Sequence, residues 1–255
     1  MKAILLAAGV GRRLSEASGN KPKCLLEFDG VSLLRRHLDA LQSVGIREII
    51  IVAGYQADLL EAEIARSGAA HLTEVVLNPD YRKGSLISLL IGLRRLNDRD
   101  ELLLMDADVL YDPRILARAL DTAIQNCFLL DRDFVDGEEP VKICVRDGTV
   151  VEFRKRVDPG LEFDFQGESV GFFRFAPALT ARLILTIESY LARHEDEAPY
   201  EEMIRDLLLE SPSDFGFEEI TGLPWIEIDF PEDVVRANAE ILPKIGKEQW
   251  NGDQR

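Results

Sequence analysis

Cysteine and histidine are scarce in this chain of 255 residues, which contains three of each. The cysteines Cys24, Cys127 and Cys144 are odd in number, far apart in sequence and without a Cys-x-x-Cys pair. We therefore expect reduced thiols that pack as small core residues of a cytoplasmic protein. The histidines are scattered without metal-ligand spacing, so the sequence predicts no zinc site.

Basic residues are outnumbered, and long apolar runs are missing. The chain has 46 Asp and Glu against 30 Lys and Arg, which gives a formal net charge of -16. Nucleic acids and anionic lipid surfaces attract basic proteins, so this balance disfavours both as partners. The apolar runs fall far short of the ~20 residues that a membrane-spanning helix needs, so we expect no membrane insertion. The sequence leaves open whether the chain forms a homo-oligomer.

The order of the predicted elements indicates an α/β protein. Residues 3–8, 49–53 and 102–105 are apolar throughout and have the length of buried strands, while 32–44 and 85–96 show helical spacing. Such strands separated by helices are typical of a parallel sheet covered on both faces. Later in the chain, Asp147-Gly148 joins two short strands and predicts a β-hairpin. We expect one domain over residues 1–245 and a polar C-terminal tail over 246–255.

The segment after the first strand combines glycines with positive charge. Residues 6–14 read Leu-Ala-Ala-Gly-Val-Gly-Arg-Arg-Leu, and residues 12–23 contain four cations and one anion. Glycines after a buried strand let backbone N–H groups approach an anion, and Arg and Lys bind phosphate oxygens. The segment therefore predicts a cradle for a triphosphate. A solvated surface turn is the simpler interpretation, but Arg13 and Lys23 favour the cradle.

Two familiar phosphate-binding motifs do not fit this segment. A dinucleotide-binding fingerprint needs a third small residue where this chain has Leu14. The chain also has no Gly-x-x-x-x-Gly-Lys-Ser/Thr sequence, which excludes a P-loop ATPase.

Two motifs in this region resemble a known family. Leu-Ala-Ala-Gly-x-Gly-x-Arg-Leu, followed by Pro-Lys-x-Leu-Leu at residues 22–26, is similar to the nucleotidyltransferases that make NDP-sugars and CDP-alcohols. The resemblance extends through Asp106-Ala107-Asp108 to Trp-Ile-Glu-Ile-Asp at 225–229, and it points most closely to phosphocholine and inositol-phosphate cytidylyltransferases. It implies a Rossmann-like three-layer α/β/α fold with a mixed, mainly parallel sheet and a small β-hairpin insertion. It also implies Mg²⁺ and a phosphate that attacks the α-phosphorus of an NTP, releasing pyrophosphate.

Aspartates at strand ends are the predicted metal ligands. Asp108 follows the strand at 102–105 and Asp229 ends a later strand, and ligands gather at the carboxyl ends of parallel strands. Mg²⁺ takes one or two carboxylates together with substrate phosphates. We expect Asp108 and Asp229 to bind it and Asp106 to support them. The alternative is that each aspartate caps the element that follows it.

The resemblance implies roles for other residues. Arg13 is expected at the β- and γ-phosphates and Lys23 at the α-phosphate, while Lys155 corresponds to the lysine that holds the acceptor phosphate. The nucleotide-binding residues it implies are Leu6, Ala7, Ala8, Gly9, Gly11, Gly84, Ser85 and Ser88. The acceptor-binding strand is expected to contribute Glu168 and Gly171.

The nucleobase and the acceptor stay open at this stage. The loop at 84–88 has Ser85-Leu86 where some relatives have Asn-Gly, so CTP is the favoured nucleotide but is not fixed by the sequence. For Ser85 a helix-capping role is the alternative. A quaternary ammonium acceptor would need an aromatic cage, for which Tyr81, Tyr111, Tyr200 and Trp225 are available.

The leading hypothesis is a Mg²⁺-dependent nucleotidyltransferase that uses CTP and a small phosphorylated acceptor. Phosphocholine, inositol 1-phosphate and 2-aminoethylphosphonate are the acceptor types considered. One alternative is a sugar-1-phosphate nucleotidyltransferase that makes an NDP-sugar. Others are a metal-dependent glycosyltransferase, because Asp106-x-Asp108 fits its metal motif, and a non-catalytic nucleotide-binding domain.

Overall fold

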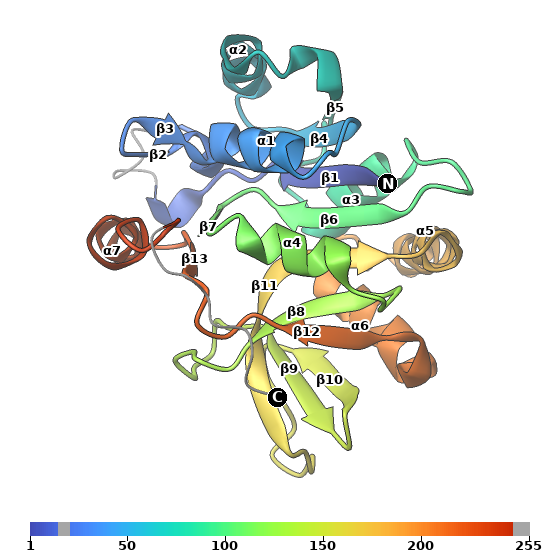
Figure 1. Ribbon diagram of the computed structural model, residues 1–255. Helices are drawn as coiled ribbons and strands as arrows, with labels where there is room; N and C mark the ends of the chain where they lie inside the picture. Colours follow the sequence, from blue (N-terminus) through green and yellow to red (C-terminus); the bar gives the residue numbers. More distant parts are fainter. Residues whose placement is uncertain (15–20, 247–255) are drawn as a thin grey trace.

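The computed structural model in Figure 1 describes residues 1–14 and 21–246. Residues 247–255, which make up most of the expected polar tail, lie outside the described residues. The strands of the large sheet are β1 (Lys2–Ala7), β4 (Ile49–Ala53), β5 (Thr73–Leu77), β6 (Leu102–Asp106), β8 (Cys127–Asp131), β9 (Lys142–Arg146), β10 (Thr149–Arg154), β11 (Phe165–Phe175) and β12 (Gly216–Glu219). Short strand pairs are formed by β2 (Glu27–Phe28) with β3 (Val31–Ser32), and by β7 (Val109–Tyr111) with β13 (Trp225–Glu227).

Helices cover both faces of the large sheet (Figure 1). They are α1 (Leu33–Ser43), α2 (Ala57–Ser67), α3 (Ser85–Leu93), α4 (Arg114–Asp121), α5 (Pro177–Ala192), α6 (Tyr200–Glu210) and α7 (Pro231–Arg236). Helices α1, α2 and α4 pack in one apolar cluster, and α3, α5 and α6 pack in another on the opposite face. The expected three-layer α/β/α arrangement is confirmed.

The sheet joins a parallel half to an antiparallel half. Its main path runs β10-β9-β11-β6-β1-β4-β5, with β8 paired to β11 and to β12. Strands β6, β1, β4 and β5 are parallel, so their carboxyl ends lie at one edge, whereas β11 is antiparallel to β6, β8 and β9. The predicted hairpin is β9–β10, where Asp147 and Gly148 have φ values of 51° and 72° as a tight two-residue turn requires.

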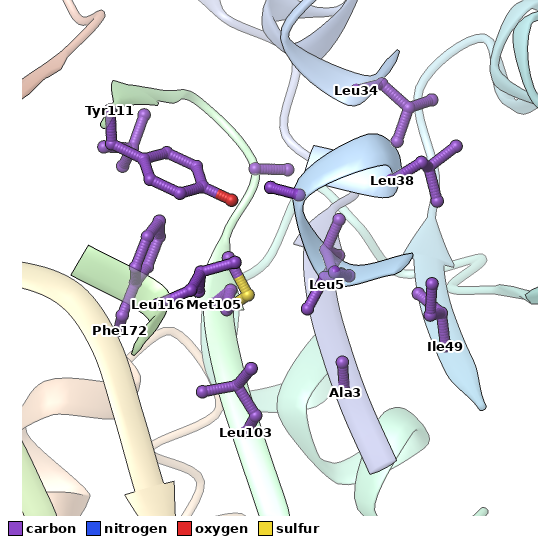
Figure 2. Packing of buried hydrophobic residues seen from close by; sticks show 14 of the residues in the cluster. Ala3, Leu5, Leu34, Leu38, Ile49, Leu103, Met105, Tyr111, Leu116 and Phe172 are labelled. Carbon is purple, nitrogen blue, oxygen red and sulfur yellow. The ribbon is translucent and has the colours of Figure 1, made fainter. Parts of the chain in front are cut away.

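Alternation of side chains along the central strands divides the core into two clusters. Ala3 and Leu5 of β1 face α1 and α4, while Ile4 faces α3. Figure 2 shows Leu34 and Leu38 of α1 lying over Leu5. This matches the apolar pattern from which the strand and the helix are predicted. The three cysteines are buried and unpaired, as expected of core thiols.

Helix boundaries follow local hydrogen bonding more closely than apolar spacing. The Ser32 hydroxyl accepts a hydrogen bond from the backbone N–H of Arg35 (3.1 Å) and caps α1 as predicted. By contrast, α4 ends at Asp121 rather than near residue 124. There the Thr122 hydroxyl accepts the N–H of Ile124 (3.1 Å), an alternative to continuing the helix.

Within the described part of the chain, none of the helices has the length and apolar character needed to cross a bilayer.

Candidate active site

A cavity of about 520 Å³ opens at the edge where the parallel strands end. Every residue predicted to bind nucleotide lines this cavity, and the predicted ligands and cations Arg13, Lys23, Asp108, Lys155 and Asp229 line it too. The nucleotide set consists of Leu6, Ala7, Ala8, Gly9, Gly11, Gly84, Ser85 and Ser88. Segments that are far apart in sequence therefore form one site, to which the C-terminal part of the chain contributes Glu227 of β13 and Asp229.

Gly11 lets the chain turn closely around Lys23. Its φ of 62° lies in the left-handed region, and a Cβ there would come within 2.9 Å of Cγ of Lys23. A side chain at position 11 would therefore strain the backbone and displace the lysine. The first glycine segment and the later Pro-Lys motif are thus one structural unit.

The ammonium of Lys23 lies between the two predicted metal ligands. Its Nζ is 3.0 Å from Oδ2 of Asp108 and also forms an ion pair with Asp229. Burial alone would lower the pKa of Lys23, but the two carboxylates outweigh burial and raise it. Lys23 is therefore charged at neutral pH and stands where the predicted metal and phosphates would meet.

Glu139 brings the other two predicted cations together. Its Oε2 is 3.3 Å from Nη1 of Arg13 and 3.2 Å from Nζ of Lys155, and the two cations lower its pKa against the opposing effect of burial. The Arg13 guanidinium is also 3.6 Å from Asp229 and lies 4.9 Å from the ring centre of Phe230. The side chains of Arg13 and Lys155 stay half exposed, and both can exchange a carboxylate for a substrate phosphate.

Three carboxylates form a group that suits a divalent cation. One oxygen from each of Asp108, Glu227 and Asp229 lies within 4.8 Å of the others. Mg²⁺ prefers oxygen ligands, so the donor set fits the predicted metal. Glu227 was not predicted. Glu227 ends β13, two residues before Asp229. Side chains two residues apart in an extended chain point to the same face, so the spacing between Glu227 and Asp229 could have identified Glu227 as a third ligand. Asp229 does not cap α7, because Phe230 occupies the N-cap position and Asp233 accepts the N–H groups of Asp229 and Phe230.

Asp106 lies beneath these ligands in contact with Tyr200. The Tyr200 hydroxyl donates a hydrogen bond to Oδ2 of Asp106 (2.6 Å). Burial and the charge of Asp108 raise the pKa of Asp106. Gly171 packs against the same carboxylate, since a Cβ at this residue would be 2.5 Å from Oδ2 of Asp106. The structure thus places Gly171 in a recess beside Lys155 and Asp106, outside the main cavity.

The start of α3 is bound to the start of α6, and no side chain of the described residues caps α3. Gly84 occupies the N-cap position, and the Ser85 hydroxyl instead accepts the backbone N–H of Tyr200 (3.0 Å). The capping alternative for Ser85 is therefore wrong, because its hydroxyl faces the start of α6. A Cβ on Gly84 would lie 2.9 Å from the backbone of Glu197 and Ala198. The Ser88 hydroxyl accepts a hydrogen bond from buried Asn78 (2.9 Å), which fixes this wall of the cavity.

A second cavity of about 250 Å³ lies next to the first and shares two of its residues. Glu168 lines it together with Trp225, and Glu227 and Asp229 line both cavities. The four aromatic residues considered as a cage are not brought together. Tyr111 is buried in the core against Phe172, and Tyr81 and Tyr200 line the first cavity, so Trp225 is the one member at the second.

Comparison with known proteins places this geometry in a family. Residues 3–147 match the model of the MobA-like NTP transferase domain. The chain is 25% identical to CTP:phosphoglutamine cytidylyltransferase of Campylobacter jejuni, over 92% of this chain and 98% of that protein. It is 24% identical to CMP-5'-(3-aminopropyl)phosphonate synthase of Streptomyces rubellomurinus over 95% of this chain, and 29% identical to a bifunctional IPC transferase and DIPP synthase of Archaeoglobus fulgidus over 99%. The chain spans only 39% and 46% of these last two proteins.

Solved structures share the fold. The inositol-1-phosphate CTP transferase of T. maritima superposes with a TM-score of 0.76 at 21% identity, covering 96% of this chain and 97% of that one. CTP:phosphocholine cytidylyltransferase of Streptococcus pneumoniae superposes with a TM-score of 0.73 at 21% identity, covering 93% and 97%. The family model matches more than half of the 255 residues. The chain therefore belongs to the MobA-like NTP transferase family and is a nucleotidyltransferase.

Proposed function

We propose that the protein is a Mg²⁺-dependent cytidylyltransferase that transfers CMP from CTP to a small phosphorylated alcohol or phosphonate and releases pyrophosphate. The observation that carries this proposal is the convergence of Lys23 with Asp108 and Asp229 in a cavity that Lys155 also lines. Curated relatives named for CTP or CMP transfer support cytidine as the nucleobase.

The chemistry requires placement and charge rather than a base. An anionic oxygen of the acceptor bonds to the α-phosphorus, while the bond from that phosphorus to the oxygen bridging to the β-phosphorus breaks. Its electron pair leaves with pyrophosphate. Since the attacking oxygen is already ionised, no proton has to be removed, and the barrier comes from bringing anions together.

The cations of the site have distinct places in this reaction. Lys23 would bind the α-phosphate, Arg13 the β- and γ-phosphates, and Lys155 the acceptor phosphate. Asp108, Glu227 and Asp229 would hold Mg²⁺, which when bound would neutralise triphosphate charge. Both Arg13 and Lys155 contact Glu139, so binding of two phosphates would release one carboxylate from both cations.

A pyrophosphate-release screen tests the proposal. It crosses CTP, UTP, GTP and ATP with phosphocholine, inositol 1-phosphate, 2-aminoethylphosphonate and hexose 1-phosphates. We expect pyrophosphate with CTP and one of the first three acceptors. Release only with a hexose 1-phosphate would make the protein an NDP-sugar enzyme. Nucleotide binding without release would support a binding domain. Sugar transfer from an NDP-sugar, with release of NDP, that survives Arg13→Ala and Lys23→Ala would support a glycosyltransferase.

A further inference from the structure

The second cavity is joined to the reaction centre through shared walls. Glu227 and Asp229 line both cavities. Glu139, which binds Lys155, lines the second. Lys155 itself lines the first cavity, but its partner Glu139 lines the second, so a small acceptor whose phosphate meets Lys155 has room to extend into the cavity of about 250 Å³. The chemistry of that lining determines what the rest of the acceptor can be.

The lining is strongly acidic. Among the described residues that line this cavity, Arg236 is the one cation and seven side chains are carboxylates. Some of these acids already have partners, since Glu139 binds two cations and Asp233 accepts the N–H groups at the start of α7. Asp131 and Glu168 are different, because the described residues form no ion pair with either of them.

Asp131 and Glu168 are direct cross-strand neighbours. They pair in the antiparallel register of β8 and β11, which places two carboxylates side by side at one end of the sheet. Like charges directly opposite one another destabilise a sheet, and this pair is also shielded from water. Asp131 is only 6% exposed, and burial together with the charge of Asp131 raises the pKa of Glu168 to about 7.

Hydrogen bonds hold Asp131 in place without neutralising it. It accepts from the indole N–H of Trp225 (2.7 Å) and from the backbone N–H of Asp133 (2.9 Å). Trp225 itself lines the cavity, as does Phe134. Fixed carboxylates beside aromatic rings bind organic cations well, through ion pairing and cation–π contact. A neutral polyol would leave this acidic pair without a cation.

We infer that the acceptor carries an ammonium group, which binds between Asp131 and Glu168 while its phosphate or phosphonate meets Lys155. The acceptor is thus zwitterionic, with the two charges at opposite ends of a short chain. This inference rests on the proposed function, because it assigns the substrate class of the same site. It selects aminoalkyl phosphonates and phosphocholine-like acceptors over inositol phosphate and sugar phosphates.

Acceptors with and without an ammonium group test the inference. With CTP, 2-aminoethylphosphonate is compared with 2-hydroxyethylphosphonate, and phosphocholine with inositol 1-phosphate. The readouts are kcat/KM for pyrophosphate release and the Kd of each acceptor by calorimetry. Two charged contacts predict a preference of about 100-fold for the amine, because each contact contributes ~1.5 kcal/mol.

Two substitutions test whether Asp131 and Glu168 cause the preference for the amine. Glu168→Gln should raise the KM for 2-aminoethylphosphonate by about tenfold, since it removes one charged contact, and leave the values for 2-hydroxyethylphosphonate and CTP unchanged. Asp131→Asn should act in the same way. The control is Glu138→Gln, an exposed glutamate in the adjacent loop that does not line the cavity. This variant should leave the KM of both phosphonates unchanged.

The outcomes separate the inference from the proposed function. Equal kcat/KM and Kd for the amine and hydroxyl compounds, or equal losses for both in Glu168→Gln, would overturn the inference alone. No pyrophosphate with any acceptor would overturn the proposed function. The calorimetric Kd values would then decide the inference, and similar values for the two phosphonates would overturn it.

Discussion

Nζ of Lys23 lies 3.0 Å from Oδ2 of Asp108 and forms a second ion pair with Asp229. The lysine therefore offsets part of the negative charge of the carboxylates that the metal would need. When Mg²⁺ and the triphosphate bind, the ammonium can turn from these carboxylates to the α-phosphate.

Replacing Lys23 tests its two expected roles, which are binding the α-phosphate and pairing with the metal-ligand carboxylates. In Lys23→Ala we expect kcat to fall by about 100-fold or more, since one charged contact to the transition state is lost. We also expect Mn²⁺ to bind the nucleotide-free protein more tightly, because Asp108 and Asp229 lose their competing cation. Mn²⁺ titration followed by electron paramagnetic resonance measures the second effect. Lys21→Ala, which removes an exposed cation from the same segment, is the control. An unchanged kcat and unchanged Mn²⁺ affinity would contradict both roles.

The carboxylate group predicts dependence on a divalent metal. Asp108→Ala should reduce Mg²⁺-dependent turnover by about 100- to 1000-fold, because it removes a ligand from a three-carboxylate group. Pyrophosphate release measured over a range of Mg²⁺ concentrations checks this. Asp98→Ala changes an exposed aspartate and should have no effect. Near-normal turnover of the Asp108 variant would refute its assignment as a metal ligand.

Lys155 is predicted to act on the acceptor rather than on the nucleotide. Its ammonium is half exposed, lines the first cavity and is bound to Glu139, which lines the second. Lys155→Ala should raise the KM of the acceptor by about tenfold and leave the KM of CTP unchanged. The neighbouring Arg156→Ala, in which an exposed cation is lost, serves as the control. A selective loss of CTP affinity would show that the lysine belongs to the nucleotide side.

Tyr200 is predicted to stabilise the floor of the site. Tyr200→Phe leaves the partly buried Asp106 carboxylate without the donor that now lies at 2.6 Å, which should lower the free energy of unfolding by about 1–3 kcal/mol. Tyr190→Phe removes an equivalent hydrogen bond to Asp206 at the surface and should cost less, because water can replace the donor. Urea unfolding of both variants tests this, and equal losses would contradict the interpretation.

Buried His37 makes stability depend on pH. It packs against Tyr111, and burial lowers its pKa from 6.5 to about 4. Between these values the unfolded chain binds a proton that the folded protein does not, so this contribution to stability is lost as pH falls from 6.5 toward 4. From pH 7 to pH 5, a His37→Phe variant should lose about 2 kcal/mol less stability than the wild type. His71→Phe, at an exposed position, should lose as much stability as the wild type. The same dependence of unfolding free energy on pH in the wild type and both variants would contradict the prediction.

The sequence contained enough information to predict the fold and to select residues that line one cavity. Glycines after β1, Lys23 in its own motif and Asp108 at a strand end are each recognisable locally, and parallel strands bring their ends to one edge. The two core faces also follow from alternation, as Ala3 and Ile4 show.

Interactions between distant segments were not predictable in this way. The contact of Glu139 with Arg13 and Lys155 depends on how the loop before β9 folds back over the site. The pairing of Asp131 with Glu168 depends on the register of β8 and β11, which no local pattern specifies. For Ser85 the local rule gave the wrong answer, because the N–H of Tyr200 is a tertiary partner for its hydroxyl.

A crystal structure with Mg²⁺ and a non-hydrolysable CTP analogue tests the central claim most directly. The account predicts that the triphosphate lies along the turn at Gly11 in contact with Arg13 and Lys23. It also predicts that the metal is bound by Asp108 and Asp229. A nucleotide whose phosphates lie away from these residues, with Lys23 still paired to both carboxylates, would contradict it.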